Sequence, residues 1–92
     1  MALVARPSNQ YEKDIKLMKR RGKDISKIDH VIDLLCAEET LPEQYRDHPL
    51  RGNWIGFREC HIEPDWLLIY FINGKDLELI LSRTGSHSDF RF

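Results

Sequence analysis

Residues 66–74 read Trp-Leu-Leu-Ile-Tyr-Phe-Ile-Asn-Gly, and this stretch decides the fold. Apolar side chains follow one another from residue 67 to residue 72, which is typical of a central strand covered on both faces. Asn73-Gly74 is the strongest hairpin signal in the chain. Leucines at alternate positions over residues 76–82 then predict the next strand. These two antiparallel strands are the expected centre of a sheet.

The segment before the central strand predicts a further strand. Residues 54–62 read as extended structure, and the turn Glu63-Pro64-Asp65 joins them to the central strand. Because side chains of a strand alternate between its faces, Glu59 and His61 share one face, about 7 Å apart, and Cys60 lies on the other. This alternation excludes a Cys60–His61 catalytic dyad. The carboxylate can orient the imidazole, and we expect it to raise the pKa of His61.

The N-terminal half begins with a predicted edge strand at residues 3–6 and continues into an amphipathic helix. Apolar residues recur at helical spacing from residue 11 onward. Ser8 or Asn9 is the expected N-cap, with Glu12 placed for a capping box. Gly22 is the expected end of this helix.

A second predicted helix, from Asp24 to about Ala37, forms an antiparallel hairpin with the first. Pro42 interrupts both periodicities, so residues 38–47 are expected to form a loop. One strand, two helices and three strands in this order predict the α+β class, with the helices on one face of a mostly antiparallel sheet. The 92 residues are sufficient for one small domain spanning 1–92.

Composition limits where and on what the protein acts. A formal net charge of −1 argues against strong non-specific binding of nucleic acid. Basic residues nevertheless cluster on the first helix, where Lys16 and Lys19 form either a solvated face or an RNA-binding surface. No apolar run approaches the roughly 18 residues of a membrane span. The two cysteines match no metal or redox spacing and are expected to stay reduced, so we expect a cytoplasmic protein.

Three histidines have the chemical setting of a catalytic site. His48 and His61 lie within a stretch rich in charged and aromatic residues, and His87 follows near the C-terminus. Imidazoles are suited to proton transfer near neutral pH. Guanidinium groups are suited to phosphate contacts, and the arginines that accompany these histidines are Arg51, Arg58 and Arg83. The combination predicts an RNA-cleaving site. The same histidines with a carboxylate could form a zinc site, but their spacing matches no recognised metal motif, so no metal and no cofactor are expected.

Five short motifs follow one another along the chain: His48-Pro49-Leu50, Gly52-Asn53-Trp54, Phe57-Arg58-Glu59-Cys60-His61, Pro64-Asp65-Trp66-Leu67-Leu68-Ile69-Tyr70 and Arg83-Thr84-Gly85-Ser86-His87. Together they resemble the YafQ branch of the RelE/ParE toxin superfamily. The resemblance covers nearly the whole chain. It implies a β-α-α-β-β-β fold like that of microbial ribonucleases, and a toxin that cuts messenger RNA on the translating ribosome.

The resemblance also implies roles for individual residues. His48, His61, Asp65 and His87 match positions that are catalytic in such toxins, and Arg83 matches a phosphate-facing arginine. Glu59 stands where a close relative has aspartate. Attack of a ribose 2′-OH on the adjacent phosphate needs a base, an acid and a cation. The sequence leaves the base and the acid open; as a working hypothesis we take His48 as the base and His87 as the acid.

Substrate contacts and partners follow from the same resemblance. Relatives often carry an aromatic residue four positions after the last histidine, where this chain has Arg91; Phe90 is the neighbouring aromatic residue that we expect to make the contact. A cognate antitoxin is the implied partner, together with the ribosomal A site on the 30S subunit. We expect the toxin to be monomeric when free. The competing hypothesis is a protein without nuclease activity, either a ParE-like inhibitor of gyrase or an antitoxin-bound regulator.

Overall fold

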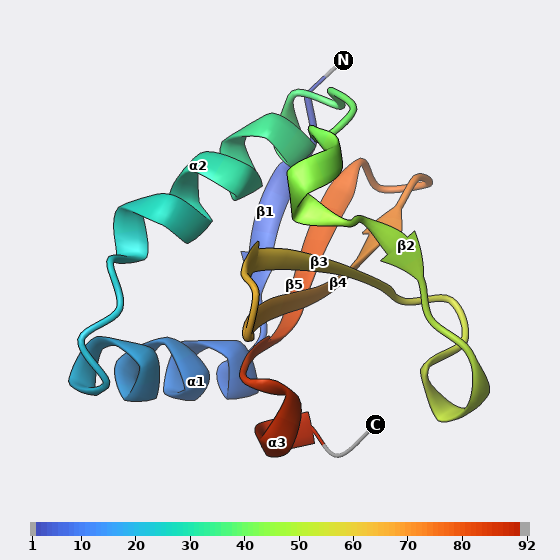
Figure 1. Cartoon of the computed structure of the whole chain (residues 1–92). Coiled ribbons are helices and arrows are strands. Elements are labelled where there is room, and N and C mark those ends of the chain that lie inside the picture. The colour runs from blue at the N-terminus through green and yellow to red at the C-terminus, as the bar shows by residue number, and fades with distance from the viewer. Residues whose placement is uncertain (1, 91–92) are drawn as a thin grey trace.

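A five-stranded sheet forms the centre of the computed structural model, which describes residues 2–90. The strand order is β1-β5-β4-β3-β2, and only β1 runs parallel to its neighbour. The predicted α+β class is confirmed (Figure 1). In chain order the elements are β1 (Val4–Pro7), α1 (Asn9–Arg20), α2 (Ile25–Cys36), the 3₁₀ turn η1 (Glu43–Tyr45), β2 (His48–Pro49), the 3₁₀ turn η2 (Gly52–Trp54), β3 (Arg58–Glu63), β4 (Trp66–Asn73), β5 (Glu78–Gly85) and α3 (His87–Phe90).

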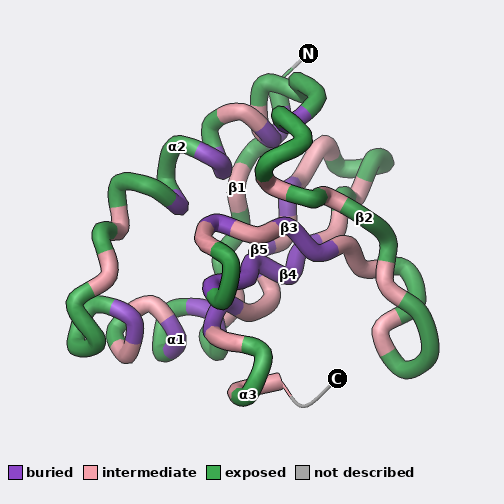
Figure 2. Tube along the Cα trace, in the orientation of Figure 1, coloured by how far each residue is buried: buried purple, intermediate pink, exposed green. Residues whose placement is uncertain are grey.

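The central position predicted for residues 67–72 is confirmed. β4 lies between β3 and β5, and residues 66–70 are all buried. Leu68 and Tyr70 belong to the main core, which they share with Met18 of α1 and Ile28 of α2. Figure 2 shows this buried centre, with the helices turning their buried positions toward the sheet.

Local signals explain both helix starts. The Ser8 side chain accepts a hydrogen bond from the backbone N–H of Tyr11, and Asp24 likewise caps α2 through Ser26. The predicted capping box is wrong, because the N–H of Ser8 donates to the carbonyl of Leu81 rather than to Glu12. In Figure 1 the two helices open into a V from the turn at residues 21–24.

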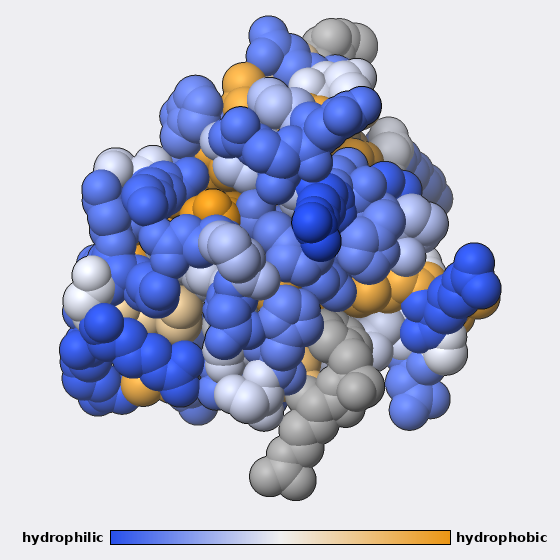
Figure 3. All heavy atoms as spheres, in the orientation of Figure 1, coloured by the Kyte–Doolittle hydropathy of each residue, from blue (hydrophilic) through white to orange (hydrophobic). Residues whose placement is uncertain are grey.

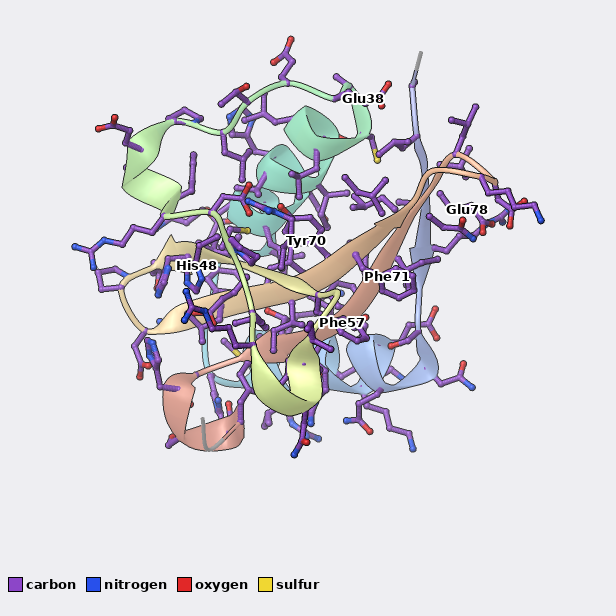
Figure 4. All side chains as sticks on the ribbon, turned by 90° about the vertical axis from the view of Figure 1, so that its right-hand side faces the viewer. Glu38, His48, Phe57, Tyr70, Phe71 and Glu78 are labelled. Atoms are coloured by element: carbon purple, nitrogen blue, oxygen red, sulfur yellow. The ribbon has the colours of Figure 1, made fainter. Side chains whose placement is uncertain are left out.

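The strand predicted at residues 54–62 begins only at Arg58. Residues 51–56 instead form a loop that projects from the sheet (Figure 1), closed by a hydrogen bond from the N–H of Leu50 to the carbonyl of Phe57. Two left-handed glycines, Gly52 and Gly56, allow the chain to turn there. Phe57 packs edge-on against Phe71, with ring centroids 5.1 Å apart (Figure 4).

Other strand boundaries differ from the predicted ones, because strand pairing in the folded sheet outweighs the local sequence signals. The Asn73-Gly74 hairpin has a longer turn, residues 74–77, so β5 begins at Glu78 rather than at residue 76. β2 and α3 were not predicted, since two or four residues are too few to show a period. Arg91, considered above, lies outside the described residues. Within residues 2–90, no helix has both the length and the apolarity to cross a membrane.

Candidate active site

The register of the sheet places three of the predicted site residues in one row. His48 pairs with Glu59, Glu59 with Ile69, and Ile69 with Arg83, across β2, β3, β4 and β5. Residues opposite one another in a sheet share a face, and this face is the one turned away from the main core. His61 lies on the same face, two residues along β3 from Glu59.

Glu59 lies at the centre of the three imidazoles. Its Oε1 is 3.4 Å from Nε2 of His61 and 3.9 Å from Nε2 of His48, and the residue is only 5% exposed. The ring centroid of His61 lies 6.3 Å from that of His48 and 5.6 Å from that of His87. The fold therefore brings together side chains from β2, β3 and α3, as the sequence predicted for one site.

The partners of His48 and His87 determine which nitrogen faces the site. Nδ1 of His48 lies 3.1 Å from the carbonyl oxygen of Pro49, and Nδ1 of His87 lies 2.6 Å from Oδ1 of Asp65. Carbonyl and carboxylate oxygens only accept, so both Nδ1 atoms donate. Each ring is left with Nε2 for proton transfer. Asp65 also accepts a hydrogen bond from the backbone N–H of His87, so both the backbone and the ring of His87 are held by the same carboxylate.

The expectation that nearby acids raise the pKa of His61 is wrong. Burial lowers the pKa of His61, and this outweighs the opposing effect of Glu59; the two other site histidines and Arg46 lower it further. Its Nδ1 is buried without a hydrogen-bond partner among residues 2–90. Burial thus favours the neutral form of His61 and leaves one of its ring nitrogens without a partner in the described range.

Arg83 is held by an acid that the sequence analysis did not single out. Nε and Nη2 of Arg83 donate to the two carboxylate oxygens of Asp14, over 3.0 and 3.2 Å. Asp14 is buried on α1 and also accepts from the backbone N–H of Thr84. Phe90 lies on the guanidinium, 5.1 Å from its central carbon to the ring centroid. The sequence did contain a sign that Asp14 is buried, because this residue falls on the apolar helical stripe that contains Tyr11 and Met18.

The other predicted substrate contacts lie apart from the imidazoles. Arg58 pairs with Asp47 over 3.3 Å, and Tyr70 donates to the same carboxylate over 2.6 Å. Arg51 precedes η2 in the projecting loop. Lys16 and Lys19 are exposed on α1. Figure 3 shows a mostly hydrophilic face, with apolar atoms near the projecting loop at its right. Trp66 is fully buried and donates a hydrogen bond to Thr84, so it packs in the interior.

Glu59, His61 and His87 also match the donor set of a metal site. One ligand atom from each lies within 4.8 Å of the others. A carboxylate and two imidazoles are a ligand set that zinc and copper accept. The absence of a recognised spacing in the sequence therefore does not exclude a metal, because β3 supplies Glu59 and His61 whereas His87 comes from α3, far away in the sequence.

The fold and the site together define a small α+β protein in which three histidines cluster with a buried glutamate on the sheet face turned away from the main core. The chain belongs to the YafQ family, described as bacterial toxins of type II toxin–antitoxin systems; the family model matches residues 3–91. It is 46% identical over 82 residues to the mRNA interferase toxin YafQ of Escherichia coli K12, covering 88% of this chain and 87% of that protein.

Two solved structures extend the likeness to three dimensions. The E. coli DinJ–YafQ toxin–antitoxin complex matches with a TM-score of 0.86 and 42% identity, covering 97% of each chain. A metal-bound toxin from Helicobacter pylori matches with a TM-score of 0.88 and 39% identity, covering 97% of this chain and 98% of that one. The family resemblance inferred from the motifs is confirmed.

Proposed function

We propose that this protein is an endoribonuclease toxin of a type II toxin–antitoxin pair, which cuts messenger RNA on the translating ribosome in the bacterial cytoplasm. The observation that carries the proposal is the meeting of His48, His61 and His87 around Glu59. Relatives named mRNA interferase toxins and a relative solved with an antitoxin support the substrate and the partner.

The reaction is transfer of a phosphoryl group within the RNA. Nε2 of His48 takes the proton of a ribose 2′-OH, whose oxygen attacks the adjacent phosphorus. The bond from phosphorus to the 5′-oxygen breaks, and Nε2 of His87 donates a proton to that leaving oxygen. The products are a 2′,3′-cyclic phosphate and a 5′-OH end. Asp65 stabilises the imidazolium form of His87 through Nδ1.

The remaining site residues stabilise the negative charge of the phosphorane or bind and position the substrate. Arg83 is the cation for the pentavalent phosphorane, with Asp14 and Phe90 fixing its direction. Glu59 and His61 position the neighbouring imidazoles and the substrate. Arg58, Arg51, Lys16 and Lys19 are proposed phosphate contacts on the approach to the site, where exposed basic groups give a salt-dependent affinity.

We propose that this chemistry needs no metal. Glu59, His61 and His87 would hold a divalent ion, which would supply a Lewis acid for the phosphate oxygens. The same ion would occupy imidazole lone pairs that proton transfer requires. Protein that has been stripped of metal with EDTA and then freed of the chelator is therefore expected to cleave the ribosome-bound message, and cleavage should fall when Cu²⁺ or Zn²⁺ is added.

Primer extension on a message bound to ribosomes with an open A site tests the proposal. Discrete cuts are expected with the wild-type protein and none with His87→Ala, whose fold is checked by circular dichroism. Ser88→Ala, on the same short helix, is the matched control and should cut normally. Cuts on naked RNA would remove ribosome dependence. An intact message in every lane would overturn the nuclease assignment, and inhibition of gyrase supercoiling would then be assayed.

A further inference from the structure

A cavity of about 400 Å³ lies beside His61, and the catalytic assignments above do not use it. It is lined by residues 44–46, at the end of η1, and by residues 61–64, at the end of β3. β2 pairs only with Arg58 and Glu59, so within residues 2–90 the edge of β3 next to the cavity has no strand neighbour. His61, which lies on the catalytic face, is thus part of the wall of this cavity.

The polar side chains of this cavity are available to a ligand. Gln44 and Arg46 are exposed, and their side chains form no hydrogen bond or ion pair with any residue in the described range 2–90. By contrast, the guanidinium groups of Arg21, Arg58 and Arg83 are all paired with carboxylates. Glu63, the acid in the lining, is already neutralised by Lys23 and Lys27 over 2.7 and 2.8 Å.

The backbone of Arg46 is a second, independent observation. Its φ and ψ are both 47°, which is the left-handed region that favours glycine. An arginine there costs folding free energy, and its guanidinium gains no hydrogen bond or ion pair among residues 2–90 in return. Strained residues of this kind concentrate at functional sites, where the side chain serves a ligand.

The remaining walls suit a nucleotide. Tyr45 presents a half-buried aromatic ring, and Ile62 and Pro64 add apolar surface. Single-stranded RNA is held by base stacking on aromatic side chains, by amide contacts to base edges and by cations at phosphates. The cavity offers all three within reach of His61.

We propose that this cavity binds the nucleotide adjacent to the scissile phosphate, with the base against Tyr45, Gln44 at the base edge and Arg46 at the flanking phosphate. The inference rests on the proposed nuclease function and extends it to a substrate subsite. The open edge of β3 could alternatively take a strand of a protein partner, and this alternative is an outcome of the test.

Arg46→Gly removes the guanidinium and relieves the backbone strain at once. Steady-state cleavage of the ribosome-bound message is expected to show a KM raised about tenfold, as for the loss of one charge-assisted contact, with kcat within about twofold. The thermal midpoint should be unchanged or higher, which excludes unfolding as the cause. Gln44→Ala, at an exposed position, should raise KM to a smaller extent.

Two control variants separate the subsite from general effects. Arg6→Gln removes a cation from β1, at the opposite edge of the sheet, and Glu38→Gly relieves the same left-handed strain after α2. Both should leave KM unchanged. If Arg6→Gln raises KM as much as Arg46→Gly, the effect is one of net charge and the subsite is overturned. If the wild-type protein and Arg46→Gly cut the message equally well, the proposed subsite is wrong but the nuclease function stands. If the wild-type protein leaves the message uncut, the proposed nuclease function is wrong.

A direct readout uses adenosine 3′-monophosphate and ¹⁵N-labelled protein. Saturable amide shifts are expected at Tyr45, Arg46 and Glu63, and they should be lost in Arg46→Gly. Equal shifts with inorganic phosphate at the same concentration would overturn a nucleotide site, because the base would add nothing. An Arg46→Gly protein that cuts normally but has lost affinity for its antitoxin would assign the cavity to the protein partner instead.

Discussion

Asp65 and His87 lie in contact although the imidazole and the carboxylate are both largely exposed, at 52% and 69% of their side-chain surface. Hydrogen bonds from the backbone N–H and from Nδ1 of His87 lower the pKa of Asp65. The carboxylate therefore stays ionised beside the proposed general acid. At the scale of single residues, this pair sets the direction in which His87 presents its proton.

Asp65→Asn is expected to lower kcat by about 10²- to 10⁴-fold, because an amide stabilises the imidazolium far less than a carboxylate does. The side chains of Asp65 and His87 are both largely exposed, so the urea midpoint of unfolding should hardly change. Single-turnover cleavage with urea unfolding measures both quantities. Asp76→Asn, in another exposed turn, is the matched control. An Asp65→Asn protein with wild-type kcat would remove Asp65 from the mechanism.

At the scale of elements, β5 is longer than the strand beside it. β1 ends at Pro7, opposite Leu81, so the last residues of β5 have no strand neighbour on that side. Asp14 of α1 takes this place, because its carboxylate accepts the N–H of Thr84 and both donors of Arg83. The buried carboxylate of Asp14 thus satisfies a backbone donor at the edge of the sheet and also fixes the orientation of the Arg83 guanidinium.

Asp14→Asn is expected to destabilise the fold by about 1–3 kcal/mol, since it leaves Arg83 without its counter-charge and weakens buried hydrogen bonds. Activity should fall as well, because the guanidinium is no longer held. Urea unfolding and cleavage kinetics are the measurements. Asp29→Asn, on the exposed face of α2, should leave both unchanged. Wild-type activity in a folded Asp14→Asn protein would show that Arg83 needs no support from α1.

The junction between β5 and α3 depends on a glycine. A Cβ at Gly85 would lie 2.7 Å from Oδ2 of Asp89 and 3.2 Å from Cζ of Phe90. Asp89 caps the N–H of Ser86 and pairs with Arg21, which anchors the segment bearing His87. Gly85→Ala should therefore displace α3 and lower kcat at least tenfold, an effect of about 1.4 kcal/mol. Gly74→Ala, where nothing lies within 4 Å, is the control. Equal kcat values for the two variants would contradict this account.

At the scale of the whole molecule, ion pairs join segments that are distant in sequence. Lys23 and Lys27 tie the start of α2 to Glu63 beside the β3–β4 turn, and Arg21 ties α1 to Asp89. Hydrogen bonds from Lys23 and Lys27 lower the pKa of Glu63, and the hydrogen bond from Arg21 lowers that of Asp89. These pairs hold the two ends of the site against the helices.

Stability is expected to decrease in acid for this reason. The folded-state pKa values of Glu63 and Asp89 lie below their ordinary values, so the unfolded chain binds protons first as the pH falls. Their contribution is complete above about pH 5 and is lost progressively below about pH 4. Urea unfolding from pH 6 to pH 2 measures the loss. The double variant Glu63→Gln/Asp89→Asn should show a shallower decrease, and an identical slope would contradict the assignment.

Signals short in range determined most of the fold from sequence. The apolar run 67–72, the caps Ser8 and Asp24 and the helical stripes depend on residues only a few positions apart, and they predicted the central strand, both helices and the α+β class. The projecting loop was missed because residues 54–57 have strand-like composition, whereas two left-handed glycines and the Leu50–Phe57 hydrogen bond turn the chain.

The sequence by itself also indicated which side chains would carry the proposed chemistry, because imidazoles are suited to proton transfer and guanidinium groups to phosphate contacts. Tertiary structure alone decided how they act. Burial, which exists only in the folded state, lowers the pKa of His61, and the partner of Arg83 lies 69 residues away at Asp14. The cavity at Arg46 likewise forms only when η1 packs beside β3. Distances across a folded chain and the exclusion of water have no counterpart in the linear order of residues.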